Sequence, residues 1–142
     1  MRSEVNGNGG PMLKINKEVV DAIIAHARKE APLEACGYLA EKGGIVVAEY
    51  PLTNADVSEE HYSLKPEEQF AAVRQMRMEG VRLRAVYHSH PRSEARPSEE
   101  DISLAYDPDL RSVIISLLGR NESVRSFRIE EDFVIEEDVE IL

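Results

Sequence analysis

Apolar residues follow two different periods along the chain, and their order predicts an α/β fold. Runs with the length and β-branched content of strands lie at 12–15, 34–41, 45–50, 82–88, 112–118, 124–129 and 133–135. Three segments have helical spacing instead: residue 17 to just before Pro32, Pro66 to Gly80, and Ser98 to about residue 105. Strands that alternate with helices in this order predict a mixed β-sheet sandwiched by helices.

The second helix has clear end signals. Pro66 suits the first helical turn, and Gly80 suits a C-terminal cap. We expect Phe70, Val73 and Met76 to form its buried face. The residues just before this helix, 61–64, could add a short extended piece.

The candidate chemistry lies where the 82–88 strand meets a polar loop. Successive strand side chains point to opposite faces, so His88 and His90 project to the same side and can share one cation. Ser89 points the other way, which suggests a hydrogen bond that supports the site from behind. Eleven residues after His90, Asp101 offers a carboxylate. Two imidazoles and one carboxylate leave a tetrahedral zinc ion one position for water, which is typical of catalytic sites.

The segment that carries Asp101 also has the features of a helix start. Ser98 can serve as the N-cap, and acidic residues in the first turn suit the helix dipole. The two interpretations agree, because a carboxylate in a capped first turn is firmly held. A histidine pair separated by one residue also occurs by chance, so the serine and the aspartate at these spacings carry much of the metal-site prediction.

Together these residues resemble the signature of the JAMM (MPN-plus, Mov34-type) zinc metallopeptidases. The signature has H-x-H, then seven residues, then S-x-x-D, and here His88, His90, Ser98 and Asp101 match it without departure. The family also has an upstream glutamate followed by a Cys-Gly pair, which Glu34-Ala35-Cys36-Gly37 resembles. The resemblance spans about residues 12 to 120.

The resemblance implies a function and roles for further residues. It implies a JAMM/MPN fold with a topology like that of cytidine deaminases, and zinc held by His88, His90 and Asp101. Glu34 would act as general base, and Ser98 would help to stabilise the oxyanion. Members cut after the C-terminal Gly-Gly of ubiquitin-like proteins. This compact chain looks more like the prokaryotic members that act on small sulfur-carrier proteins.

Composition sets the remaining expectations. With 142 residues and 42% apolar content, we expect one domain over 12–142, after a polar, glycine-rich and disordered tail over 1–11. No apolar run approaches the ~20 residues of a membrane span, and the start lacks a signal-peptide pattern. A single cysteine then favours a reducing cytoplasm. The net charge of −10 argues against sequence-independent binding of nucleic acid. Nothing in the sequence specifies an oligomeric state.

Other interpretations stand beside the peptidase. Cys36 could be a nucleophile, although a lone cysteine in an apolar strand is more often simply buried. We expect a surface or half-buried position for His26; His61 is a distant candidate ligand, but a structural or surface role is favoured. The chain could be a non-catalytic MPN scaffold that binds partners, but such domains typically lose metal ligands. A zinc deaminase lacks support, because one cysteine cannot supply its P-C-x-x-C motif. A JAMM-like domain of a DNA-repair-associated family shares the H-x-H and S-x-x-D pattern. The net charge of −10 on this chain argues against that assignment.

Overall fold

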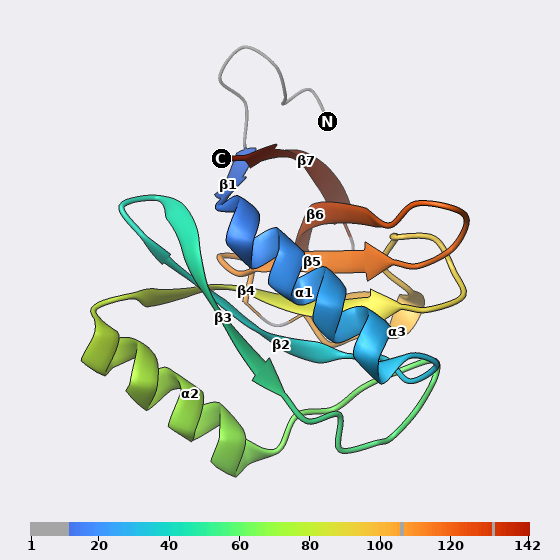
Figure 1. Cartoon of the computed structure of the whole chain (residues 1–142), viewed down its shortest axis with the longest axis horizontal. Helices are drawn as coiled ribbons and strands as arrows, with labels where there is room; N and C mark the ends of the chain where they lie inside the picture. Colours follow the sequence, from blue (N-terminus) through green and yellow to red (C-terminus); the bar gives the residue numbers. More distant parts are fainter. Residues whose placement is uncertain (1–11, 106, 132) are drawn as a thin grey trace.

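The computed structural model describes residues 12–142 except 106 and 132, and the predicted tail over 1–11 lies outside this range. The described residues form three helices and seven strands (Figure 1). In chain order they are β1 (Met12–Ile15), α1 (Lys17–Glu30), β2 (Cys36–Lys42), β3 (Ile45–Leu52), α2 (Pro66–Glu79), β4 (Arg82–His90), α3 (Glu99–Ser103), β5 (Arg111–Ser116), β6 (Ser123–Glu130) and β7 (Phe133–Ile141).

The strands form one mixed sheet that closes on itself. Their spatial order is β1-β3-β2-β4-β5-β6-β7, and β1 also pairs in parallel with β7. The β1–β3 and β4–β5 pairs are parallel, and the remaining neighbours are antiparallel. The predicted mixed sheet is confirmed, but the last strand is longer than the expected 133–135. It extends to Ile141 because pairing with β1 and β6 supplies backbone partners for a segment with few apolar residues.

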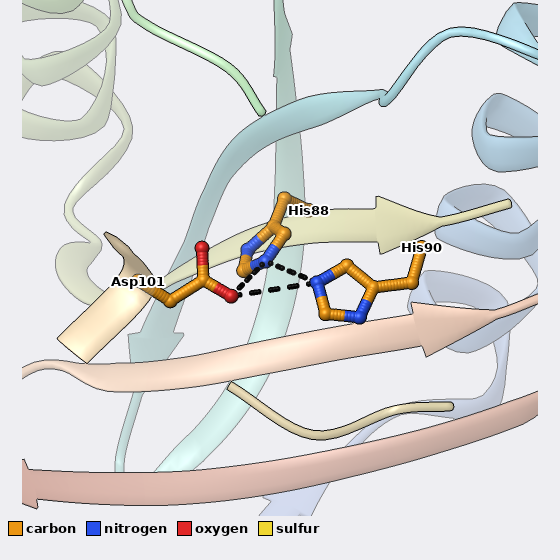
Figure 2. A group of neighbouring side chains, drawn as sticks. All are labelled: His88, His90 and Asp101. Atoms are coloured by element: carbon orange, nitrogen blue, oxygen red, sulfur yellow. Dashed lines mark hydrogen bonds and ion pairs between the residues drawn. The ribbon is translucent and has the colours of Figure 1, made fainter. Parts of the chain in front are cut away.

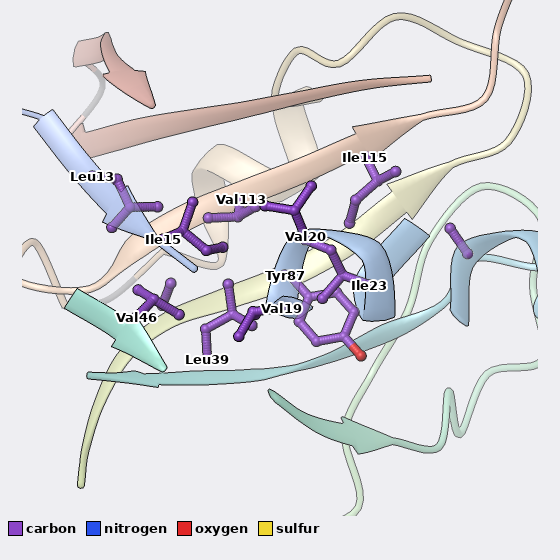
Figure 3. Packing of buried hydrophobic residues seen from close by; sticks show 12 residues of the cluster. Leu13, Ile15, Val19, Val20, Ile23, Leu39, Val46, Tyr87, Val113 and Ile115 are labelled. Atoms are coloured by element: carbon purple, nitrogen blue, oxygen red, sulfur yellow. The ribbon is translucent and has the colours of Figure 1, made fainter. Parts of the chain in front are cut away.

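Helix α1 covers one face of the sheet. Its buried residues Val19, Val20 and Ile23 pack against Leu39 of β2 and Tyr87 of β4, as Figure 3 shows. These residues belong to the larger of the apolar clusters, which also takes in Val113 and Ile115 of β5 and residues of β1 and β3. The helix expected from residue 17 to Pro32 is confirmed, because its apolar stripe meets the apolar face of the sheet.

Helix α2 covers the opposite face. Tyr38 and Ala40 of β2 alternate with Leu39, and they pack against Ala72 and Met76. The prediction that Phe70 is buried is wrong, because this residue is 73% exposed. Ala72 and Met76 are four residues apart and define the buried stripe of the helix, and Phe70 does not lie on that stripe. The predicted end is confirmed, because the helix ends at a C-cap glycine, Gly80, in the left-handed conformation with φ of 74°.

The β4 strand carries the predicted metal-binding histidines at its C-terminal end. It runs from Arg82 to His90, two residues beyond the expected end, because β5 pairs with it in parallel as far as His90. Residues 91–98 then lead into α3, which is shorter than expected. The segment 61–64 belongs to the loop between β3 and α2 and forms no strand. No helix within the described residues is long and apolar enough to cross a membrane.

Candidate metal centre

Three predicted side chains converge at the end of β4 (Figure 2). The Nε2 atom of His88 lies 3.1 Å from Oδ2 of Asp101 and 3.2 Å from Nε2 of His90. The third side of the triangle, from His90 Nε2 to Asp101 Oδ2, is 3.4 Å. Both histidines are buried and the aspartate is nearly so, with 11% of its side chain exposed. Strand alternation therefore places the two imidazoles as the sequence predicts.

The spacing of these donor atoms fits a tetrahedral metal ion. Bonds of about 2.0–2.1 Å from zinc place neighbouring ligand atoms roughly 3.3 Å apart, which matches the sides of this triangle. His90 donates from Nδ1 to the carbonyl oxygen of Glu94 at 2.8 Å, which leaves the Nε2 lone pair of a neutral ring directed at the centre. Two imidazole nitrogens and one carboxylate oxygen can thus hold a divalent ion and leave a further position open.

Asp101 is held in place by the start of α3. Ser98 Oγ accepts a hydrogen bond from the Asp101 N–H at 3.0 Å, and the Ser98 N–H donates to Asp101 Oδ2 at 2.8 Å. This capping box confirms Ser98 as the N-cap. Burial opposes ionisation of Asp101, but hydrogen bonds from His88 and His90 outweigh it and hold its pKa below the usual range. The carboxylate is therefore charged and oriented.

Glu34 lies two residues before Cys36, which pairs with His88 of β4. It is only 3% exposed, and its Oε1 has no hydrogen-bond partner among the residues that the structure describes. Burial raises the pKa of Glu34 to about 8; the nearby His90 lowers it and the Asp101 carboxylate raises it. A divalent cation at the centre would favour the charged carboxylate and lower this pKa. Glu34 thus has a buried, unpartnered oxygen within the electrostatic influence of His90 and Asp101, which keeps it a candidate general base.

The backbone next to Glu34 is fixed by hydrogen bonds from two sides. The Glu34 N–H donates to the Ser58 carbonyl at 2.8 Å, and Asn54 Nδ2 donates to the Glu34 carbonyl at 3.2 Å. On the other side, Ser89 Oγ accepts from the Ala35 N–H at 2.8 Å, and the Ser89 N–H donates to the Ala35 carbonyl at 3.0 Å. Ser89 therefore makes the supporting hydrogen bond that its orientation suggested.

A cleft of about 450 Å³ opens beside the centre. His88 and Asp101 line the end nearest the centre, whereas Glu34 and His90 are not among its lining residues. Its floor is the sheet face that carries Tyr38, Val86, Ser112 and Ile129. One wall comes from the β3–α2 loop and α2, through Tyr62, Ser63, Leu64 and Gln69, and the other comes from α3 and from Leu104, Ala105, Asp107 and Leu110. The cleft is largely apolar and has the candidate centre at one end.

Other candidate residues take structural positions. Cys36 is fully buried, and burial raises the pKa of its thiol to about 12, so a role as nucleophile has no support. His61 is exposed and contacts Asp56, with Nδ1 3.0 Å from Oδ2, and it is not part of the group of three converging side chains. His26 is half-buried, with Nδ1 2.7 Å from the Tyr87 hydroxyl.

Two residues near the centre carry no signal in the sequence. Tyr62 stacks on the imidazole of His88, with ring centroids 4.8 Å apart and planes inclined by 30°. Asn54 holds the β3–α2 loop: Nδ2 donates to the His61 carbonyl at 3.0 Å, and Oδ1 accepts from the Ser63 N–H at 3.3 Å. The Tyr62 contact joins segments far apart in the chain, the Asn54 contacts lie within one loop, and neither residue belongs to a short motif.

The closed mixed sheet with this centre at the end of β4 defines a domain of the JAB1/MPN type. The family model for prokaryotic homologs of the JAB domain matches residues 16–130, and the chain belongs to this family. The chain is 38% identical over 134 residues to the CysO-cysteine peptidase of Mycobacterium tuberculosis, covering 92% of each. It is 33% identical over 115 residues to the desampylase of Haloferax volcanii, covering 76% of this chain and 83% of that protein.

A solved structure agrees with the fold assignment. A JAB1/MPN domain protein from Archaeoglobus fulgidus superposes with a TM-score of 0.65 at 19% identity, covering 94% of this chain and 100% of that one. The predicted JAMM/MPN fold and family are confirmed. The curated relatives are named as a peptidase and a desampylase, so the chain is a JAMM-type hydrolase, which favours the enzyme over the non-catalytic scaffold.

Proposed function

We propose that the chain is a zinc-dependent peptidase that hydrolyses the bond after the C-terminal Gly-Gly of a sulfur-carrier or ubiquitin-like protein. The observation that carries this proposal is the triangle of His88, His90 and Asp101 donor atoms beside the buried carboxyl of Glu34. The names of the curated relatives, a CysO-cysteine peptidase and a desampylase, support the substrate class. The two glycines suit the proposal because residues without side chains can approach a buried centre closely.

Each site residue has a role in this reaction. His88, His90 and Asp101 would hold zinc, which supplies Lewis acidity and lowers the pKa of a bound water to ~7. Glu34 would serve as general base, holding a proton at its carboxylate and passing it to the leaving amine. Ser98 stabilises the oxyanion. This agrees with its position as N-cap, since Oγ accepts from the Asp101 N–H and its own hydrogen stays available for donation.

We further propose that the cleft takes the C-terminal tail of the carrier. Glu34 must reach the leaving amine, and it lies outside the cleft, so the amine should leave on the side of Glu34 and His90. The tail then enters from the side of His88 and Asp101. Replacing Ser112 on the cleft floor by Phe should raise KM for the carrier while the metal content stays unchanged. An unchanged KM would contradict this assignment of the cleft.

The main test combines metal analysis with carrier cleavage. The purified chain should contain one zinc ion and release an amino acid or peptide fused to a Gly-Gly carrier, and a chelator should stop cleavage. Glu34→Gln should keep the zinc and lose about 10²–10⁴-fold in kcat, the usual contribution of a general base. Asp101→Ala should lose zinc, whereas His61→Ala should retain it. Full cleavage by Glu34→Gln, or full zinc occupancy in Asp101→Ala, would refute the proposed roles.

A further inference from the structure

The two histidines at the centre are supported differently. A metal-binding imidazole usually donates its second N–H to a neighbour, which fixes the ring orientation and the tautomer. His90 follows this rule, through its hydrogen bond from Nδ1 to the Glu94 carbonyl. His88 does not: its Nδ1 is buried and finds no hydrogen-bond partner within the described part of the chain. Another contact must therefore fix this ring.

The ring of Tyr62 is placed to do so. It stacks on the His88 imidazole with centroids 4.8 Å apart and an interplanar angle of 30°. A stacked ring limits rotation of the imidazole about the Cα–Cβ and Cβ–Cγ bonds, because rotation would drive the imidazole into the phenol ring. The contact can thus fix the orientation of the ring, as the hydrogen bond of His90 does, but it does not select the tautomer.

The position of Tyr62 is itself fixed by the loop around it. Asn54 binds the residues on both sides, accepting from the Ser63 N–H and donating to the His61 carbonyl. The Ala55 N–H also donates to the Ser63 carbonyl at 2.9 Å. A residue between two such anchors is held firmly enough to orient its neighbour, whereas a freely mobile tyrosine could not.

We propose that Tyr62 is the positioning residue of His88 and that it acts by ring stacking in place of a hydrogen bond. This inference rests on the proposed metal site. The aromatic face carries the effect and the hydroxyl does not. Hydrogen-bonding partners of metal ligands are typically worth 10–100-fold in metal affinity, and we expect the stacked ring to lie at the low end, about tenfold.

The experiment measures zinc affinity by competition with a chelator and records the visible absorption spectrum of the Co²⁺-loaded protein. Tyr62→Leu and Tyr62→Met remove the ring, and having both allows for one of them failing to fold. Tyr62→Phe keeps the ring. Tyr50→Leu makes the same chemical change on β3, where the tyrosine hydroxyl contacts Glu79 and not a candidate ligand. Circular dichroism checks that each variant is folded.

We expect Tyr62→Phe and Tyr50→Leu to bind zinc as the unmodified chain does. We expect Tyr62→Leu and Tyr62→Met to bind about tenfold more weakly, with a changed Co²⁺ spectrum. Equal affinity in the ringless variants overturns the inference, and so does a Tyr62→Phe variant as weak as Tyr62→Leu. If the unmodified chain binds no zinc, the proposed function itself fails, which is a distinct result.

Discussion

Gly37 of β2 packs closely against Tyr87 of β4, and replacing it tests this packing. A Cβ atom added there would lie 2.5 Å from Cε2 and 2.7 Å from Cζ of Tyr87, and 2.6 Å from the backbone oxygen of Tyr50. None of these atoms is the end of a flexible side chain that could move aside. The Tyr87 ring is fully buried and its hydroxyl donates to Glu49 Oε2 at 2.7 Å and contacts His26 Nδ1 at the same distance.

The expected loss for Gly37→Ala follows from these contacts. Overpacking a buried site typically costs about 1–3 kcal/mol. Displacing the Tyr87 ring also breaks two hydrogen bonds, each worth about 1 kcal/mol. The free energy of unfolding should therefore fall by about 3–5 kcal/mol, a large part of the roughly 5–15 kcal/mol of a typical domain. Because Tyr87 directly precedes His88, the variant should also bind zinc more weakly.

Urea unfolding of the metal-depleted protein, followed by circular dichroism, measures this loss without the contribution of metal binding. Tyr87→Leu removes the ring atoms that clash, so Gly37→Ala should cost less in that background, although the Tyr50 oxygen still contacts the new methyl group. A double-mutant cycle of Gly37→Ala and Tyr87→Leu gives the coupling free energy between the two positions. A loss below about 1 kcal/mol for the single variant, or strict additivity in the cycle, would refute the reasoning.

Three further predictions concern the surroundings of the centre. Cys36, with its thiol pKa raised to about 12, should be about 10⁻⁴ thiolate at pH 8, so rapid alkylation by iodoacetamide in the native protein would contradict its burial. Asn54→Ala should lower kcat even at saturating zinc, since Asn54 holds the Glu34 carbonyl, and should also weaken zinc binding, since Asn54 anchors the loop that carries Tyr62. An unchanged kcat in the zinc-saturated variant would contradict this. Burial lowers the pKa of His90 but the hydrogen bond to Asp101 raises it overall, so protons compete with the metal at higher pH than for a free imidazole. Dialysis from pH 8 to pH 5 should therefore release zinc, and full retention at pH 5 would contradict this.

The sequence predicts the local parts of the fold well and the long-range parts poorly. Helical stripes and turn residues are local, and the start of α2 at Pro66 and its end at Gly80 are found as expected. The closure between β1 and β7 involves opposite ends of the chain, and no short pattern encodes it. The strand from Phe133 to Ile141 is missed beyond residue 135, because acidic residues interrupt its apolar pattern and one of them, Glu137, is buried through its ion pair with Arg111 on β5.

In the candidate site, too, local features can be predicted from the sequence and long-range contacts cannot. His88, His90, Ser98 and Asp101 lie within fourteen consecutive positions, so strand alternation and helix capping suffice to bring them together. Glu34 was found only through the resemblance, because nothing local relates it to the histidines. Tyr62 was missed altogether, since its contact with His88 depends on how the β3–α2 loop folds over the sheet.

Strand pairing explains how Glu34 reaches the centre. Cys36 of β2 pairs with His88 of β4, so the chain just before Cys36 must run alongside the chain just after His88. Ser89 extends this pairing by two hydrogen bonds to Ala35, while its neighbours His88 and His90 face the centre. Alternate side chains of one strand thus supply two candidate ligands and the support for the candidate base. The position of the candidate base relative to the ligands is therefore set by the sheet ladder, which is among the most rigid parts of a protein, so the proposed substrate would meet a centre that is already assembled.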